Sequence, residues 1–149
     1  MSRVFRPRTW QQQRRQLMQM LAQTVRALLQ HHREDDEAWD MAAFLAMTLD
    51  EIAQTVERTV EPWEKRDYWV KADRFRQDWA WATDISQGLH QALHAHAWDH
   101  VLHHIARLFP HISDTRLPKR PRWGHRPWDG AYTRWRQRYA PPSTAQSPT

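Results

Sequence analysis

The chain has 149 residues, and its 22 Lys and Arg against 17 Asp and Glu give a net charge of +5 and a pI near 10.2. Its length is typical of one domain. The absence of Cys excludes disulfides, thiolate nucleophiles and Cys-ligated zinc, and none of the three Gly lies in a phosphate-binding loop motif. The longest apolar run, residues 41–47, is far too short to span a membrane, and residues 1–8 lack the apolar stretch of a secretory signal. We therefore expect a soluble cytoplasmic protein.

Charge is distributed unevenly along the chain. Residues 1–16 contain five Arg and no acid, residues 115–149 carry a net charge of +7, and the stretch between them carries −7. Seven of the nine Pro also lie from residue 110 onward. These shifts predict a basic N-terminal arm over 1–8, a helical bundle over 9–110, a basic and aromatic extension over 111–140, and a disordered tail over 141–149.

The first two predicted helices carry clear buried stripes. Leu17, Leu21, Val25 and Leu28 recur at helical spacing, which predicts a helix over about 9–32 with Thr9 as its N-cap. The acidic run at 34–37 suits the start of a second helix, because the positive end of the helix dipole favours acids. The second stripe is Ala38, Ala42, Leu45, Leu49, Ile52, Val56 and Thr59. This helix is expected to end before Pro62.

Two further helices follow in the prediction. Pro62 suits the first turn of a new helix, so the third helix is expected over 63–83. A fourth, with a stripe from Leu89 to Leu108, is expected to end before Pro110. We place a break between them near Gly88, although the two could equally be one long, kinked helix. The prediction is an all-α protein, an antiparallel four-helix bundle with an irregular C-terminal extension rich in Pro, Trp and Arg.

The fourth predicted helix is rich in histidine, and some of its pairs have the i, i+4 spacing that lets two imidazoles hold one metal ion. The histidines are His90, His94, His96, His100, His103 and His104. Helical metal sites usually add inward carboxylates, often as Glu-x-x-His, and the chain has no such motif. We therefore favour packing or surface roles for these histidines and predict no metal and no cofactor. No nucleophile motif points to catalysis either, so we predict a protein that is not an enzyme.

Aromatic and basic residues alternate in the third predicted helix, which could stack on bases or on a partner. We favour core positions for Tyr68, Phe75 and Trp79, with Arg and Lys stems lying over the rings. Trp69 and Trp81 fit the buried stripe less well. They are therefore the candidates in this helix for contact with a partner.

The basic segment, residues 116–138, combines cations that suit phosphate oxygens with aromatic rings that suit unpaired bases. Its candidate binding residues are Arg116, Lys119, Arg120, Arg122, Trp123, Arg126, Trp128, Tyr132, Arg134, Trp135, Arg136 and Arg138. Three interpretations stay open: contact with nucleic acid, docking on another protein, and docking back onto the acidic bundle of the same chain.

The function that these patterns favour is a small non-enzymatic helical subunit of a nucleoprotein assembly. Arg would capture the backbone of RNA or single-stranded DNA and Trp would stack on its bases. Removal of residues 113–149 is then expected to abolish binding and leave the bundle folded. The alternative is a scaffold or assembly factor that grips a protein partner through its Trp- and Arg-rich surface. The sequence leaves homo-oligomerisation open.

Overall fold

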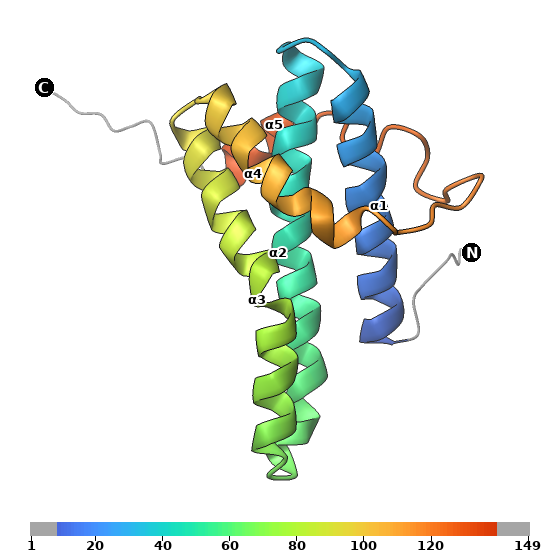
Figure 1. Ribbon diagram of the computed structural model, residues 1–149, viewed down its shortest axis with the longest axis vertical. Helices are drawn as coiled ribbons and strands as arrows, with labels where there is room; N and C mark the ends of the chain where they lie inside the picture. Colours follow the sequence, from blue (N-terminus) through green and yellow to red (C-terminus); the bar gives the residue numbers. More distant parts are fainter. Residues whose placement is uncertain (1–8, 140–149) are drawn as a thin grey trace, which may run out of the picture.

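The computed structural model describes residues 9–139, and this range contains five helices and no strand (Figure 1). In chain order they are α1 (Trp10–Gln30), α2 (Asp36–Lys65), α3 (Trp69–His94), α4 (Trp98–Ile112) and α5 (Ala131–Tyr139). The all-helical class expected from the sequence is confirmed. None of the described helices combines the length and hydropathy that crossing a membrane requires. The arm predicted over 1–8 and the tail predicted over 141–149 lie outside the described residues.

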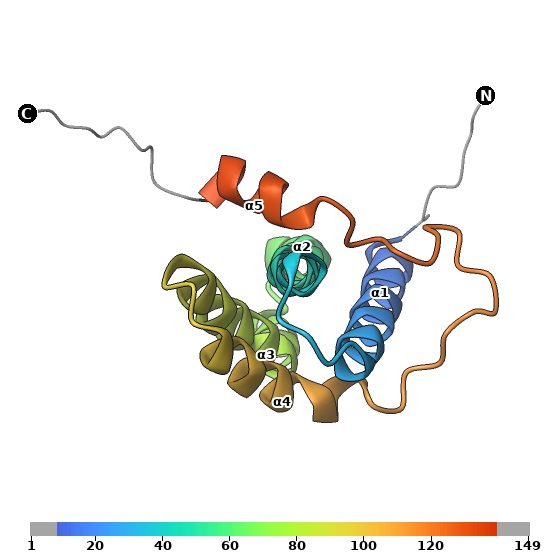
Figure 2. The same ribbon diagram turned by 90° about the horizontal axis from the view of Figure 1, so that it is seen from above.

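Helix α2 is the centre of the fold. Figure 2 shows it between α5 on one side and α3 and α4 on the other, with α1 alongside. A helix with neighbours on several sides needs apolar residues around most of its circumference. Accordingly α2 buries consecutive residues such as Leu45, Ala46 and Met47. Of the stripe predicted for this helix only Thr59 is half-buried, and the other six positions are buried.

The starts of the first two helices agree with the prediction. Thr9 caps α1, and its side-chain oxygen accepts a hydrogen bond of 3.0 Å from the backbone N–H of Gln12. Asp35 caps α2 in the same way through the N–H of Ala38. Each cap satisfies a backbone donor that the first helical turn leaves free.

The turn predicted at Pro62 is wrong, because α2 continues through this proline to Lys65 and α3 begins only at Trp69. Pro62 lies in the last turn of α2, where it removes one i→i−4 backbone hydrogen bond and only three helical residues follow it. The chain reverses at Asp67, which has a φ of 64°. The N–H of Tyr68 then bonds the carbonyl of Trp63, as in a Schellman motif.

The break predicted near Gly88 is also wrong, because α3 runs without interruption to His94. The missing side chain of Gly88 lets the ring of His104 pack against the helix backbone. The chain leaves α3 at His96, whose φ is 51°, and Ala97 closes a second Schellman motif through its N–H to the carbonyl of Ala92.

The C-terminal part of the chain is more helical than predicted. Helix α4 continues past Pro110 to Ile112, and α5 lies within the extension that was expected to be irregular. Both differences have the same cause, since apolar residues such as Ile112 and Trp135 are buried against the other helices. Burial of an apolar face stabilises short helices beyond what local propensity provides.

Candidate functional site

The basic segment is sorted into an aromatic inner face and a basic outer face. Trp128 and Trp135 are 4% and 2% exposed, and both belong to the hydrophobic core. Trp123 and Tyr132 are half-buried. All eight cations are exposed, namely Arg116, Lys119, Arg120, Arg122, Arg126, Arg134, Arg136 and Arg138. The segment therefore docks on its own helices and turns its positive charge outward.

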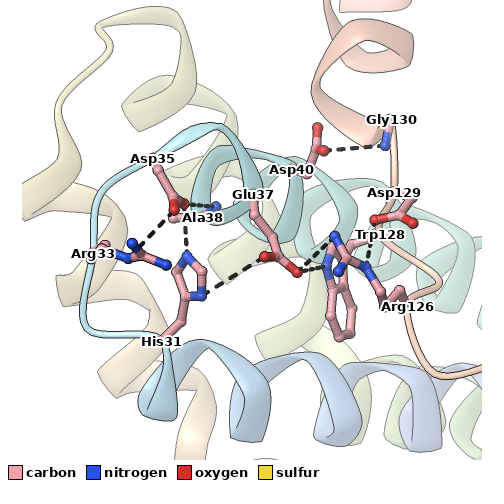
Figure 3. A network of polar contacts seen from close by, with 10 residues as sticks. All are labelled: His31, Arg33, Asp35, Glu37, Ala38, Asp40, Arg126, Trp128, Asp129 and Gly130. Carbon is pink, nitrogen blue, oxygen red and sulfur yellow. Dashed lines mark hydrogen bonds and ion pairs between the residues drawn. The ribbon is translucent and has the colours of Figure 1, made fainter.

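Acids at the start of α2 hold the aromatic face in place (Figure 3). Glu37 accepts a hydrogen bond of 3.1 Å from the indole Nε1–H of Trp128 and forms an ion pair of 3.1 Å with Arg126. Asp40 accepts the backbone N–H groups of Gly130, at 3.2 Å, and Tyr132, at 2.9 Å. Asp40 thus caps α5 from a neighbouring helix, because these donors lie at its N-terminal end.

Asp35, which lies next to these acids, contacts the C-terminal end of α1 (Figure 3). The imidazole Nε2 of His31 lies 2.7 Å from a carboxylate oxygen of Asp35, and Arg33 lies 3.8 Å from the other oxygen. Hydrogen bonds from His31 and from the N–H of Ala38 lower the pKa of the Asp35 carboxyl. The acidic run at residues 34–37 thus contacts α1 on one side and the basic segment on the other.

A second polar cluster joins α2, α3 and α5 at Asp50. Its carboxylate accepts hydrogen bonds from Ser86, from His90 Nε2 at 2.8 Å and from the hydroxyl of Tyr139 at 3.1 Å. The indole Nε1–H of Trp135 donates to His90 Nδ1 at 2.9 Å. Burial raises the pKa of Asp50, but the bonds from His90, Ser86 and Tyr139 outweigh it, and the pKa is lowered overall.

This cluster contains Ser, His and Asp, but their order differs from that of a catalytic triad. In a triad the nucleophile is bonded to the histidine, and the acid orients that histidine. Here both Ser86 and His90 bond to Asp50, and the Nδ1 of His90 accepts the N–H of Trp135. The arrangement fixes α5 on the core, which is the packing role favoured for His90 from the sequence.

The other histidines of this region pack in several places: His94 contacts the ring of Trp135, and the rings of His103 and His104 contact each other. His96 stacks on Trp39 at 4.0 Å between ring centroids, and His104 packs on Gly88. His111, which follows them in α4, stacks on Trp81 at 4.1 Å. Among residues 9–139, no three His, Asp or Glu side chains are placed to hold a metal ion.

The aromatic residues predicted in the third helix separate into packed and exposed ones. Phe75 and Trp79 are half-buried, whereas Tyr68 is 52% exposed, so the core position predicted for Tyr68 is wrong. The reason is the position of the chain reversal, which places Tyr68 in the turn. Trp69 is 54% exposed at the start of α3, and Trp81 is half-buried in its stack with His111.

An open cavity of about 510 Å³ lies between the first half of α1, the first half of α3 and the residues that follow α4. Arg14, Arg15 and Arg116 line it together with the rings of Phe75 and Trp79. Arg116 is among the binding residues predicted from the sequence, whereas Arg14 and Arg15 are not. A signal was present, because Arg14 lies three residues before Leu17 and therefore on the buried face of the first helix.

Comparisons of the chain with known protein families, with curated protein sequences and with solved structures found no match in any of the three.

Proposed function

We propose that this protein is a non-enzymatic subunit that binds the phosphate backbone of RNA or single-stranded DNA through the exposed cations of the basic segment. The scaffold for them is the antiparallel four-helix bundle that we infer from α1 to α4. The observation that supports the proposal is the outward orientation of all eight cations while the aromatic residues of the segment pack inward. Each phosphate contact releases condensed counterions, so such binding weakens steeply with salt.

The proposal differs from the sequence interpretation in the role of the Trp residues. The faces of Trp128 and Trp135 pack within the fold, so they position the arginines rather than stack on bases. Apart from Arg116, which lines the cavity, three cations have no side-chain hydrogen bond or ion pair in the described part of the chain, namely Lys119, Arg120 and Arg136. These three are the best placed to contact phosphates, because binding breaks no existing ion pair.

Substitution of these three cations tests the proposal better than removal of the segment. A truncated chain would lose Trp128 and Trp135 from the core, so its failure to bind would have two explanations. The triple variant Lys119→Gln, Arg120→Gln, Arg136→Gln removes the same kind of charge and leaves the packing intact. The matched control is Lys65→Gln, Arg66→Gln, Arg74→Gln, which removes three exposed cations at the other end of the molecule.

Both variants would be titrated into labelled single-stranded RNA and duplex DNA by fluorescence anisotropy at two salt concentrations. The triple variant is expected to bind single strands about tenfold or more weakly, with a salt slope reduced by about 2, at about 0.7 per phosphate contact. The control variant is expected to bind like the unmodified chain. Absence of binding by the unmodified chain, or an equal loss in both variants, would refute the proposal.

A second candidate function, protein assembly, is favoured by the end of the α2–α3 hairpin. Figure 1 shows this hairpin extending beyond the other helices. Tyr68, Trp69 and Val70 are consecutive at its end and are 52%, 54% and 68% exposed. A cluster of exposed apolar residues that includes Trp and Tyr is typical of a protein interface.

Site-specific photo-crosslinking in the source cells tests this second function. A photoreactive amino acid at position 69 is expected to give one defined protein adduct, and the same amino acid at Leu29, which is 51% exposed, is expected to give none. Equal labelling at both positions, or no adduct at position 69, would exclude an interface at the hairpin end.

A further inference from the structure

The cavity beside Arg14 collects positive charge without a neutralising acid. Among residues 9–139, three guanidinium groups line it, from Arg14, Arg15 and Arg116, and no carboxylate does. A second cavity, of about 360 Å³, shows the contrast, because the Arg76 in its lining is paired with Glu57 at 3.0 Å and with Glu64 at 2.6 Å. The cavity beside Arg14 is therefore the one whose charge a bound anion would balance.

Of the three arginines in the lining, Arg14 is the one whose positive charge is least compensated. Its side chain is only 6% exposed, and no ion pair is formed to it by any residue in the range 9–139. A buried charge without an opposite charge is energetically unfavourable, since burial removes its hydration. This burial lowers the pKa of the Arg14 guanidinium. An anion in the cavity would supply the missing opposite charge.

The guanidinium of Arg14 is also held in one position before any ligand arrives. Its Nη1 donates to the hydroxyls of Thr55, at 3.1 Å, and Thr59, at 3.2 Å. Its central carbon lies 4.9 Å from the ring centroid of Phe75 and 5.3 Å from that of Trp79. A positively charged group fixed in this way loses little entropy on binding, which is the basis of preorganised recognition.

The lining also contains apolar and aromatic side chains, beside the polar residues Gln11, Gln19 and Thr115. Phe75 and Trp79 present ring surface to the cavity, and Met18 adds a flexible apolar side chain. The volume of about 510 Å³ lies within the range of about 300–1,000 Å³ that small-molecule sites occupy. Cations matched to an anion stand next to a surface that suits a flat apolar group.

We propose that this cavity binds a phosphate group carried on a planar aromatic ring, that is, a mononucleotide, either free or at the end of a strand. Arg15 and Arg116, which are exposed, would pair with the phosphate oxygens, because a guanidinium matches them in two-point geometry. Arg14 would supply the fixed positive charge, and the base would lie against the aromatic side. The strand-end form rests on the function proposed above, and the free-nucleotide form does not.

Isothermal titration calorimetry with the full chain tests this site. Uridine 5′-monophosphate is expected to bind, whereas uridine and inorganic phosphate are expected to bind about tenfold or more weakly, because each has only half of the recognised chemistry. A 5′-phosphorylated trinucleotide and the same trinucleotide without the phosphate distinguish a strand end from a free nucleotide. The strand-end form requires that the phosphorylated one binds more tightly than the monophosphate.

Two variants locate the binding. Arg15→Gln, Arg116→Gln is expected to weaken binding of the monophosphate at least about tenfold. Arg74→Gln, an exposed α3 position outside the cavity lining, is expected to leave it unchanged. No heat with the monophosphate, equal binding of inorganic phosphate, or equal losses in the two variants would overturn the proposal.

The triple variant at Lys119, Arg120 and Arg136 separates this proposal from the proposed function. These cations lie outside the cavity lining, so monophosphate binding is expected to persist when binding of long strands is lost. If long strands bind normally and the monophosphate does not bind, the cavity proposal fails alone. If the monophosphate binds and long strands do not, the proposed function fails alone.

Discussion

The ring of His104 in α4 packs directly on the backbone of Gly88 in α3, so closely that a Cβ at position 88 would overlap the imidazole. The imidazole can occupy this position only because residue 88 has no side chain. Gly88 therefore serves the contact between helices rather than a helix end.

Gly88→Ala is expected to destabilise the protein although Ala is the better helix former. Overpacking costs about 1–3 kcal/mol, and the gain in helix propensity offsets about 1 kcal/mol of it. Urea denaturation monitored by circular dichroism measures the net loss. In a His104→Ala background the same substitution is expected to be neutral or stabilising. An equal cost in both backgrounds would show that the imidazole is not the cause.

Acidification from pH 7 to pH 5 is expected to lower the free energy of unfolding through His104 and His111. Burial lowers the pKa of both imidazoles, and the positive charge of Arg107 lowers them further. The unfolded chain, with an ordinary His pKa of about 6.5, therefore binds protons first as the pH falls. The free energy of unfolding is therefore at its full value above a pH of about 6.5, and it decreases as the pH falls through the lower pKa values of the two histidines in the native protein.

Thermal unfolding of the double variant His104→Gln, His111→Gln provides the comparison. Its Tm is expected to change less between pH 7 and pH 5 than that of the unmodified chain. Parallel pH profiles for the two proteins would assign the effect to other groups.

Asp50→Asn is expected to destabilise the protein by about 2 kcal/mol. The carboxylate of Asp50 accepts hydrogen bonds from three donors, and in Asn an NH₂ group, itself a donor, replaces one of the accepting oxygens. The lowered pKa of Asp50 sets the pH range over which its charge contributes to stability. The contribution of this carboxylate is present above its ordinary pKa of about 3.9 and is lost as the pH falls through the native value. Denaturation of the variant and of the unmodified chain at pH 7 and pH 3 measures the loss of stability and its pH dependence. The same loss at the two pH values would contradict the role of the charge.

Arg14→Met is expected to separate stability from ligand binding. The hydroxyls of Thr55 and Thr59 keep their own acceptors, the carbonyls of Ile52 and Thr55, so no donor is left unpaired. Removal of an uncompensated buried charge is then expected to change the free energy of unfolding by no more than about 1 kcal/mol. Monophosphate affinity is expected to fall at least about tenfold. A stability loss above about 3 kcal/mol would make Arg14 a structural residue.

The sequence indicated helix positions better than helix ends. Buried stripes such as Leu17 to Leu28 follow from periodicity, which is a local property of the chain. The two chain reversals were missed because Asp67 and His96 adopt the left-handed conformation in which glycine is usual. Gly88, where a break was predicted, lies inside a helix for a reason that depends on another helix.

The candidate sites were predictable to different degrees. The composition of the basic segment identified its cations, and its opposite charge to the acidic middle made docking on the same chain one of the alternatives. The partners Glu37, Asp40 and Asp50 could not be predicted, because they lie far away in sequence. The cavity requires Arg14, Phe75 and Arg116 to converge from three elements, and no local pattern contains that information.

The connection between α2 and the basic segment has a consequence for the order of folding. Trp128 and Glu37 are 91 residues apart, and Tyr132 and Asp40 are 92 apart, whereas the α2–α3 hairpin closes through a turn at residues 66–68. Short-range contacts form sooner, because closing a long loop costs more chain entropy. The hairpin is thus expected to assemble first, with the acidic side of α2 still in water. The basic segment then docks on α2 in the last step of folding, and only this step places its cations on the outer surface.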